Sequence, residues 1–526
     1  MSGNGAVRIG IVRGSGRASG GEHADRGGPG ARAGAARRLV GSRPRRGVLS
    51  SVVVGVAALA AMVATTACGA AEVQRPQNLI IISIDTLRAD HMSLHGYARN
   101  TTPNIDAFAR RAVTFDRAIA PWPKTAPSMV SMFSGRYPHA TGVMFASRGL
   151  YVDEQQLMLA EVAKQHGLAT AAVVSNAVLG ASTNFNKGFD RYVETYEADS
   201  PYGANQRNRA NSVTLHARFL LRDLVPRGPF FLWVHYIDPH TRYDPPPEYA
   251  APFFEDEHHD HTELRLNDDD QNFHGGVAGK YWRQNGGQAE AGWYTANYDG
   301  EIAFADDMIG ELLTEMEGLG VLEDSVVMLT ADHGESLGDH QYFFEHGWFP
   351  YHACGWIPWV VYWPDNPAPG RRIAHPSGLL NLMPTALDMM GWDLPVDIFH
   401  GQSVLPVMRG EKEYTERYVI EEAGEGGLRR DEFLRSIQDE RWKLVHVPSQ
   451  SYRDMMQGVE YELYDVLADP METVNLADEH ADVVERLRVA LEDVMNATGP
   501  VAPPPGRAPR YTDEQLRQLR ALGYIR

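Results

Sequence analysis

The sequence contains only two cysteines, Cys68 and Cys354, among 526 residues. Two thiols exclude a disulfide framework, and they also exclude a zinc centre built from three or four thiolates. A hydrophobic core must therefore hold the fold together, and 43% hydrophobic residues with ten tryptophans are enough to build one.

Positive charge is also scarce. The chain carries 49 Lys and Arg against 68 Asp and Glu, a net charge of −19, and ten of the basic residues lie within residues 1–68. Such an acidic surface argues against nucleic acid as a partner. It does not argue against a small anionic substrate, because a bound metal ion inverts the field locally.

Long apolar runs are absent apart from one. Sixteen apolar or small residues, Val52–Ala67, follow the basic stretch "RPRRG" and precede Cys68. The run is short for a membrane span, so it predicts a signal peptide whose "TTAC" end resembles a lipobox; an uncleaved membrane anchor is the alternative. We expect an exported lipoprotein of the cell envelope, periplasmic or on the outer surface, attached to the membrane through lipidated Cys68.

The texture of the sequence divides the chain into five parts. We expect a disordered leader with the signal peptide at 1–68, a linker at 69–77, a main domain at 78–410, a C-terminal subdomain at 411–500, and a Pro-rich linker with a terminal helix at 501–526.

In the main domain, β-branched apolar segments alternate with amphipathic helices, which predicts an α/β fold with a mostly parallel central sheet flanked by helices. Short strand-like pieces beyond residue 411 predict a small α+β subdomain with an antiparallel sheet. The expected strands of the main sheet are 78–85, 113–120, 169–176, 229–238, 325–335 and 357–363, and the expected helices include 127–134, 157–167, 298–320, 481–498 and 512–525.

Acidic and histidine side chains follow three of these strands. Asp85, His240 and the pair Asp332-His333 stand at strand ends, where sites gather in α/β folds. Buried carboxylates need a partner or a metal, and Asp with His suits a divalent ion. We therefore expect a metal site; for each residue alone, a helix cap or an ion pair is the alternative.

The stretch "APWPKTAPSMVSMFSGRYPHATG" places Thr125 at the start of a short helix. Free N–H groups and the helix dipole favour an anion there, so Thr125 is a candidate hydroxyl nucleophile. Lys124 and Arg136 would add positive charge, and His139 would orient or protonate the substrate. The alternative is that Thr125, or Ser128, only caps the helix.

Residues 253–290 form an insertion rich in Asp and His, "FFEDEHHDHTELRLNDDDQNFHGG…". We expect a solvated loop there, with cation binding as the alternative.

Seven pieces, in this order, resemble the sulfatase family of the alkaline phosphatase superfamily, from about Asn78 to Leu476. They are "NLIIISIDTLRADHM", "TTPNIDAFA", "TAPSMVSMFSGRYPHATGV", "HYIDPHTRYDPP", "YDGEIAFADDMIGELL", "LTADHGESLGDH" and "ELYDVLADPMETVNLAD". The resemblance implies an alkaline-phosphatase-like core at 78–410, a smaller C-terminal subdomain, a metal at the sheet edge, and attack on sulfur or phosphorus.

Carried over residue by residue, the resemblance makes Asp85, Asp332 and His333 metal ligands. It makes Thr125 both the nucleophile and a metal ligand. His240 matches the histidine that contacts the ester oxygens or the leaving group, and His346 takes the place of a lysine found in many relatives.

The sequence departs from the family pattern in its nucleophile segment. Sulfatases carry Cys or Ser in C/S-x-P-x-R and oxidise it to formylglycine, whereas this chain reads Thr125-Ala126-Pro127-Ser128-Met129. Threonine cannot yield that aldehyde, so we expect no formylglycine. Thr86 also replaces a second acidic ligand, which leaves Ca, the family's habitual ion, alongside Mn, Mg and Zn as candidates.

These features predict a metal-dependent ester hydrolase or transferase in which phosphoester, including diester, cleavage is favoured over sulfate hydrolysis. The alternatives are a genuine sulfuric ester hydrolase, a binuclear phosphodiesterase with Asp238, His240 and His346 around a second metal, and a non-catalytic surface protein. We expect a small-molecule, glycan or lipid-headgroup ester as substrate and no nucleic acid; the sequence does not predict the oligomeric state.

Overall fold

The computed structural model describes residues 75–144, 150–196, 209–267, 276–278, 282–283, 285–393, 398–424, 432–499 and 509–521. The chain divides into Met1–Glu72 and Val73–Arg526, and all that follows concerns the second unit. The predicted leader with Cys68, most of the linker at 69–77 and the Pro-rich stretch at 501–508 lie outside the described residues. Among the helices that are described, none has the length and apolar character needed to cross a membrane.

The core of the fold is one nine-stranded sheet with the order β12-β2-β11-β8-β1-β5-β3-β4, and β13 also pairs with β2. All neighbouring strands are parallel except β11, which is antiparallel to both β2 and β8. The bounds are β1 Asn78–Ile84, β2 Val113–Ile119, β3 Ala169–Val174, β4 Arg191–Glu194, β5 Phe230–Tyr236, β8 Ser325–Ala331, β11 Trp356–Tyr362, β12 Arg372–Ile373 and β13 Ser377–Gly378.

The central strands β1, β5 and β8 are buried along their whole length. Strands covered on both faces are continuous apolar runs rather than alternating ones, and "NLIIISI" is such a run. The predicted α/β fold with a mostly parallel sheet is confirmed.

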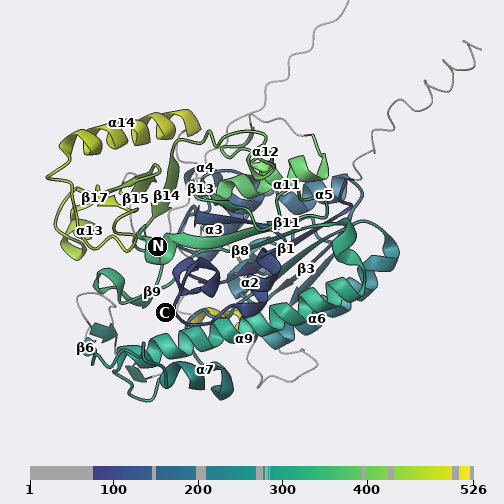
Figure 1. Ribbon diagram of the computed structural model, residues 1–526, viewed down its shortest axis with the longest axis horizontal. Coiled ribbons are helices and arrows are strands. Elements are labelled where there is room, and N and C mark those ends of the chain that lie inside the picture. The colour runs from purple at the N-terminus through teal and green to yellow at the C-terminus, as the bar shows by residue number, and fades with distance from the viewer. Residues whose placement is uncertain are drawn as a thin grey trace, which may run out of the picture. The chain divides into compact units, whose positions relative to one another are not determined.

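Helices cover both faces of this sheet (Figure 1). On one face α6 (Ala210–Leu224) packs on β3 and β5 and against α9 (Ala291–Gly318), which also contacts α2 (Pro103–Ala109) and α7 (Pro247–Phe254). On the other face α3 (Thr125–Ser134), α5 (Leu159–Gln165) and α11 (Leu382–Met390) pack together, with α5 on β3 and α11 on β8.

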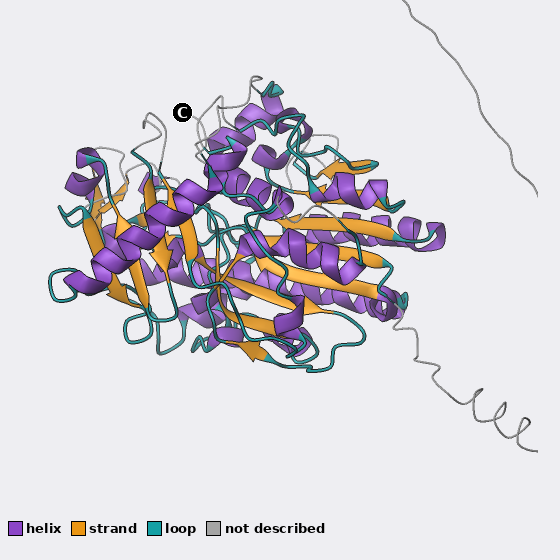
Figure 2. Cartoon of the chain, turned by 90° about the horizontal axis from the view of Figure 1, so that it is seen from above, coloured by secondary structure: helices purple, strands orange, loops and turns teal. Residues whose placement is uncertain are grey.

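A second, four-stranded antiparallel sheet follows in the chain, with the order β14-β15-β16-β17. Figure 2 shows these strands beside the main sheet, with the long helix α14 (Ala481–Thr498) lying across them. The bounds are β14 Val419–Ala423, β15 Leu434–Gln438, β16 Trp442–His446 and β17 Tyr461–Asp465. This confirms the predicted C-terminal antiparallel sheet.

Alternation along these strands gives the second sheet two apolar faces. Ile437 and Leu444 pack with Leu487 of α14, while Leu434 and Val445 pack toward a cluster that includes Cys354. Cys354 is therefore a buried apolar side chain between the two sheets.

The remaining elements are short. They are α4 Pro138–Thr141, β6 Arg265–Asn267, β7 Gly276–Ala278, β9 Ser336–Leu337, β10 Phe343–Glu345, α10 His352–Gly355, α12 Leu405–Met408, α13 Gln450–Met455 and α15 Asp513–Ala521.

Two predicted helices begin earlier than expected. Helix α3 begins at Thr125 instead of 127, because Lys124 is extended (φ −156°, ψ 141°) and Pro127 is tolerated in a first turn that needs no N–H donor. Helix α9 begins at Ala291 instead of 298.

Candidate active site

The carboxyl ends of four neighbouring strands carry the candidate site. β1 lies between β8 and β5, with Ile84 in register with Ala331 and with Tyr236, and β3 follows beyond β5. The residues that come next in the chain therefore meet at one edge of the sheet: Asp85 after β1, Asp332 and His333 after β8, Asp238 and His240 after β5, and Asn176 after β3.

Asp85, Asp332 and His333 converge as a buried group able to hold a metal ion. His333 Nε2 lies 3.4 Å from Asp332 Oδ2 and 3.8 Å from Asp85 Oδ1, and neither of these oxygens has a hydrogen-bond partner among the described residues.

The opposite oxygens are held by the protein. Asp85 Oδ2 accepts from Asn176 Nδ2 (2.6 Å), and Asp332 Oδ1 accepts from the backbone N–H groups of Thr86 (3.2 Å) and His333 (2.8 Å). Two fixed carboxylates that each turn one bare oxygen inward, beside an imidazole nitrogen, fit a divalent cation.

The charges of this group also call for a cation. Burial and the nearby charge of Asp85 raise the pKa of Asp332 well above its ordinary value. Burial opposes ionisation of Asp85 as well, but His240, His235 and His333 outweigh it and lower the pKa of that carboxyl. One carboxylate is thus stabilised at the expense of the other, and a bound cation would neutralise both.

Thr125 meets this group from the side of α3. Its Oγ1 lies 3.2 Å from His333 Nε2, and the side chain is fully buried. Ser128, one turn further along α3, donates its hydroxyl to the carbonyl of Asp332 (2.6 Å) and so fixes the helix start against the end of β8. The predicted placement of Thr125 beside Asp332 and His333, at a helix N-terminus, agrees with this geometry.

Three imidazoles line the neighbouring space. The ring of His346 lies 4.4 Å from that of His333 and 5.0 Å from that of His240, measured between centroids. His346 Nδ1 bonds Glu335 Oε1 at 3.0 Å, and the other oxygen of Glu335 accepts from the hydroxyl of Thr241 at 3.3 Å. His240 and His346 therefore stand beside the metal group, as the sequence predicts.

Burial and neighbouring charges set the protonation of these groups. Burial, together with His240 and Lys124, lowers the pKa of His346 well below its ordinary value. Lys124 directly precedes Thr125 at the start of α3. Burial raises the pKa of Glu335 to about 8, so the Glu335–His346 pair retains a proton at neutral pH.

Three residues of the site were missed in the sequence. Asn176 and His235 both hold Asp85 Oδ2, the latter at 3.3 Å through Nε2, and Glu335 holds His346. The histidine inside the apolar run "FFLWVHY" could have indicated a polar contact in the core, because a buried imidazole needs hydrogen-bond partners. The partners of His235 are Asp85 and Ser83, the latter at 2.8 Å.

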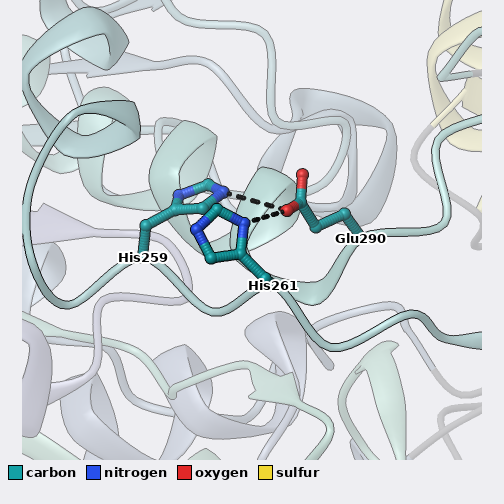
Figure 3. A group of neighbouring side chains, drawn as sticks. All are labelled: His259, His261 and Glu290. Atoms are coloured by element: carbon teal, nitrogen blue, oxygen red, sulfur yellow. Dashed lines mark hydrogen bonds and ion pairs between the residues drawn. The ribbon is translucent and has the colours of Figure 1, made fainter.

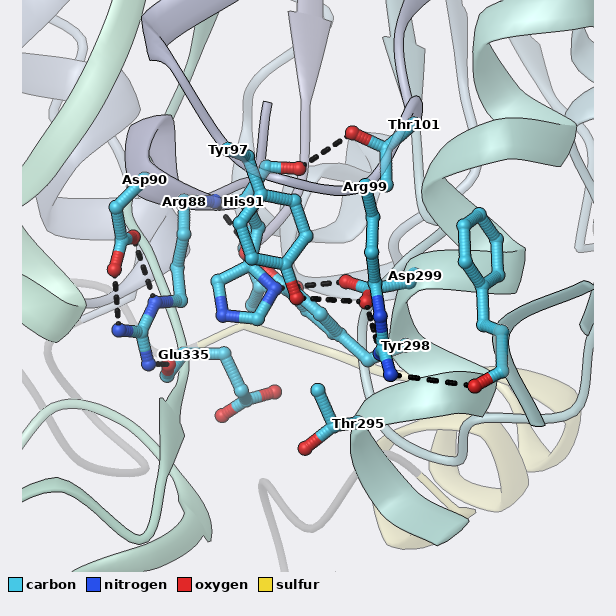
Figure 4. A network of polar contacts seen from close by, with 12 residues as sticks. Arg88, Asp90, His91, Tyr97, Arg99, Thr101, Thr295, Tyr298, Asp299 and Glu335 are labelled. Carbon is cyan, nitrogen blue, oxygen red and sulfur yellow. Dashed lines mark hydrogen bonds and ion pairs between the residues drawn. The ribbon is translucent and has the colours of Figure 1, made fainter. Parts of the chain in front are cut away.

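A network of polar contacts joins the loop after β1 to α9 (Figure 4). The hydroxyl of Tyr298 on α9 donates to the carbonyl of Thr86 (2.7 Å) and accepts from the backbone N–H of Arg88 (3.1 Å). The Arg88 guanidinium bonds Asp90, Asp339 and the carbonyl of Glu335. The loop after β1 is thereby tied to both α9 and the loop after β8.

Thr86 is the residue that the sequence predicts in place of a second acidic ligand. It adopts a positive φ of 54°, and its buried hydroxyl has no hydrogen-bond partner among the described residues. In place of a carboxylate ligand, this residue contributes its backbone N–H to Asp332.

The second metal set proposed from the sequence is not assembled. Among the described residues, two groups bring together three His, Asp or Glu ligand atoms, and Asp238 with His240 and His346 is not one of them.

His139 lies apart from the candidate site. Its Nδ1 and its backbone N–H both bond Glu422 Oε2 of β14 at 2.9 Å, and its Nε2 lies 3.1 Å from the hydroxyl of Thr498 at the end of α14. Arg136 likewise contacts Gln156 (3.4 Å). His139 therefore joins the main domain to the C-terminal sheet, because β14 supplies its partner, and its predicted catalytic role stays a prediction.

His139→Ala is expected to lower stability by about 1–3 kcal/mol, since it leaves Glu422 buried without this partner. Burial opposes ionisation of Glu422, but His139 and Arg435 outweigh it and lower its pKa from 4.5 to about 2. The ionised Glu422 therefore contributes to the stability of the fold above pH 4.5, and this contribution is lost as the pH falls toward about 2. Urea unfolding should show that the free energy of unfolding falls less between pH 7 and pH 3 in the variant than in the parent. A folded variant with greatly reduced kcat would instead restore the catalytic role.

Comparison with known proteins defines the class of this site. The sulfatase profile matches residues 77–392, and the profile for the C-terminal part of N-sulphoglucosamine sulphohydrolase matches residues 338–497. The α/β core with its mostly parallel sheet, and the group of possible metal ligands at one edge of that sheet, agree with both. The chain belongs to the sulfatase family and is a sulfatase-family ester hydrolase.

Its relatives are distant but span most of the chain. An N-acetylglucosamine-6-O-sulfatase of Bacteroides thetaiotaomicron is 24% identical over 80% of this chain and 86% of its own. A solved structure in complex with its substrate D-glucosamine-2-N,6-O-disulfate has a TM-score of 0.62 and 21% identity, covering 81% of this chain and 98% of that one. The phosphonate monoester hydrolase of Agrobacterium radiobacter has a TM-score of 0.64 and 22% identity, covering 81% and 96%.

Proposed function

We propose that this enzyme hydrolyses sulfate esters, with a sulfated sugar as the class of substrate and Thr125 as the attacking hydroxyl. The observation that carries the proposal is the position of Thr125 Oγ1, 3.2 Å from His333 Nε2 and at the N-terminus of a ten-residue helix. Relatives that act on sulfated glucosamine support the substrate class.

His333 Nδ1 faces the carbonyl of Gly334 at 2.8 Å, so it carries the hydrogen and leaves the lone pair of Nε2 to bind a cation beside Thr125. His333 is therefore a ligand and not the base, and the hydroxyl of Thr125 would lose its proton to water because a neighbouring cation favours the alkoxide. A divalent cation held by Asp85, Asp332 and His333 would supply Lewis-acid polarisation of the ester and of this hydroxyl.

The remaining groups suit the ester and its leaving alcohol. The N–H groups at the start of α3 and the charge of Lys124 favour the ester's negative oxygens. Oγ1 would form a bond to sulfur while the bond from sulfur to the alcohol oxygen breaks. The departing oxygen needs a proton, and the Glu335–His346 pair retains one at neutral pH. Water would then cleave the threonine ester.

A phosphorus ester is the second candidate, and the threonine itself favours it. A sulfated threonine lacks the hemiacetal route by which formylglycine enzymes expel sulfate, whereas a phosphorylated hydroxyl can be released by water. The phosphonate monoester hydrolase of the same fold supports this alternative.

Turnover on matched substrates separates the two. The full-length protein should be assayed with an aryl sulfate, a 6-O-sulfated glucosamine, a phosphate monoester, a phosphodiester and a phosphonate monoester, each with Ca, Mn, Mg and Zn. Sulfate release at the highest kcat/KM supports the proposal. Phosphorus esters turned over with no sulfate release would replace it with the second candidate.

Export and attachment through Cys68 remain predictions from the leader. Metabolic labelling of the expressed protein with a fatty acid, compared between the parent and Cys68→Ala, tests them.

A further inference from the structure

Two segments of the insertion at 253–290 and of the residues that follow it pair with each other through backbone hydrogen bonds. Residues 260–264 run beside 289–292: Gly292 N–H donates to Asp260 O (2.7 Å), Ala291 N–H to Thr262 O (2.9 Å) and Leu264 N–H to Ala289 O (2.6 Å). This ladder ends at Gly292, the second residue of α9, so backbone hydrogen bonds fix residues 260–264 against residues 289–292.

Three metal-binding side chains project from this ladder to one point (Figure 3). His259 and His261 are two residues apart in the chain, and their ring centroids lie 4.8 Å apart. Glu290 Oε1 lies 2.6 Å from His261 Nδ1 and 3.5 Å from His259 Nε2, and the three ligand atoms all lie within 4.8 Å of one another.

The position of His259 is built into the structure. Its side chain is 5% exposed, its ring lies 5.7 Å from that of Phe254, and its Nδ1 has no hydrogen-bond partner among the described residues. Gly292 makes the room, since a Cβ there would lie 2.8 Å from His259 Cε1 and 2.4 Å from the carbonyl oxygen of Asp260. The close approach of the two segments therefore requires a glycine.

We propose that His259, His261 and Glu290 form a second metal site, for a borderline ion of the zinc class. Two imidazole nitrogens and one carboxylate oxygen are a zinc donor set, whereas Ca and Mg prefer oxygen ligands throughout. Bond lengths of about 2.0–2.2 Å put tetrahedral ligand atoms about 3.4 Å apart, a small adjustment from the present separations. His261 is 80% and Glu290 38% exposed, so the fourth position faces solvent.

The bound ion would cross-link the segment around His259 and His261 to Glu290, the residue before α9. The same segment is tethered nearby through Asp256, which bonds Arg99 (2.9 Å), and Arg99 in turn bonds Asp299 of α9 (2.8 Å). Tyr298 precedes Asp299 on the same helix, and its hydroxyl donates to the carbonyl of Thr86, the residue after Asp85. This site is separate from the Asp85 group and does not depend on which ester the enzyme cleaves.

Metal titration tests the site apart from the catalytic one. The full-length protein, stripped with a chelator, would be titrated with Co²⁺ followed by visible absorption, and with Zn²⁺ followed by metal analysis. All variants carry Asp332→Asn, so that the catalytic group is disabled. His261→Ala removes an exposed ligand, and His258→Ala removes an exposed neighbour that lies outside the group.

With Asp332→Asn alone, we expect one tightly bound equivalent and the strong absorption of tetrahedral Co²⁺. His258→Ala should retain both, and His261→Ala should lose them, with a fall in affinity beyond the roughly 10–100-fold typical of changes to residues that only support a ligand. Glu290→Gln should behave like His261→Ala while keeping the helix start. No bound equivalent in Asp332→Asn, or an equal affinity in His261→Ala, would overturn the proposal.

Discussion

Thr125→Ala is expected to abolish turnover while leaving the fold intact. Loss of a nucleophile costs on the order of 10⁴–10⁶-fold in kcat in enzymes whose catalytic residues act as a unit. The only atoms removed are a hydroxyl and a methyl at the start of α3, and the helix keeps its packing through Ser128. The measurement is kcat on the best substrate, with circular dichroism and thermal unfolding to confirm the fold.

Ser131→Ala is the matched control for this variant. Ser131 lies on the same helix, and its hydroxyl is equally buried but has no hydrogen-bond partner among the described residues. Ser131→Ala should keep kcat within about twofold, since removing a hydroxyl that makes no hydrogen bond breaks no interaction. A Thr125→Ala protein as active as Ser131→Ala would mean that another group attacks the ester.

Much of the site was predictable because its ligands follow apolar strands. Asp85 and Asp332 had to be functional or paired, since a bare carboxylate at the end of a buried strand is costly. A parallel sheet brings such ends to one edge whatever the order of the strands. The order of the strands in the sheet could not be predicted from the sequence. Nor could the antiparallel direction of β11, which lies between β2 and β8.

The supporting residues could not be read from the sequence, since their partners are remote in it. Asn176 and His235 meet Asp85 across 91 and 150 residues, and neither stands in a pattern that names its partner. His139 shows that closeness in the sequence does not fix a residue's partners. It follows the nucleophile closely in the chain, yet Glu422, 283 residues away, decides its role.

The insertion shows the same limit on a smaller scale. Its run of Asp and His predicts a solvated loop, with cation binding as the alternative, and does not show which residues would hold a cation, because Glu290 stands at its far end. Glu290 reaches His259 and His261 only once the two ends pair as a ladder. Composition can thus signal metal-binding residues without showing which of them converge.

Asp332→Asn is expected to remove metal binding at the Asp85, Asp332 and His333 group together with activity and, at the same time, to stabilise the protein in which this group holds no metal. Losing one ligand of the catalytic ion costs several kcal/mol of transition-state stabilisation, on the order of 10³-fold or more in kcat/KM. Asn keeps an oxygen to accept from the N–H groups of Thr86 and His333. Its amide NH₂ replaces the bare Oδ2 and faces the bare Oδ1 of Asp85, so repulsion becomes attraction.

The pH dependence of unfolding isolates this effect. The pKa of Asp332 is raised in the folded state by burial and by Asp85, so its contribution to stability is present below 3.8 and is lost as the pH rises toward the folded pKa. The metal-free parent should therefore lose more stability between pH 5 and pH 7 than metal-free Asp332→Asn does. Added Ca or Mn should raise the Tm of the parent and leave that of the variant unchanged. Equal melting of the two metal-free proteins at pH 7, with the same response to metal, would show that Asp332 neither repels Asp85 nor holds the ion.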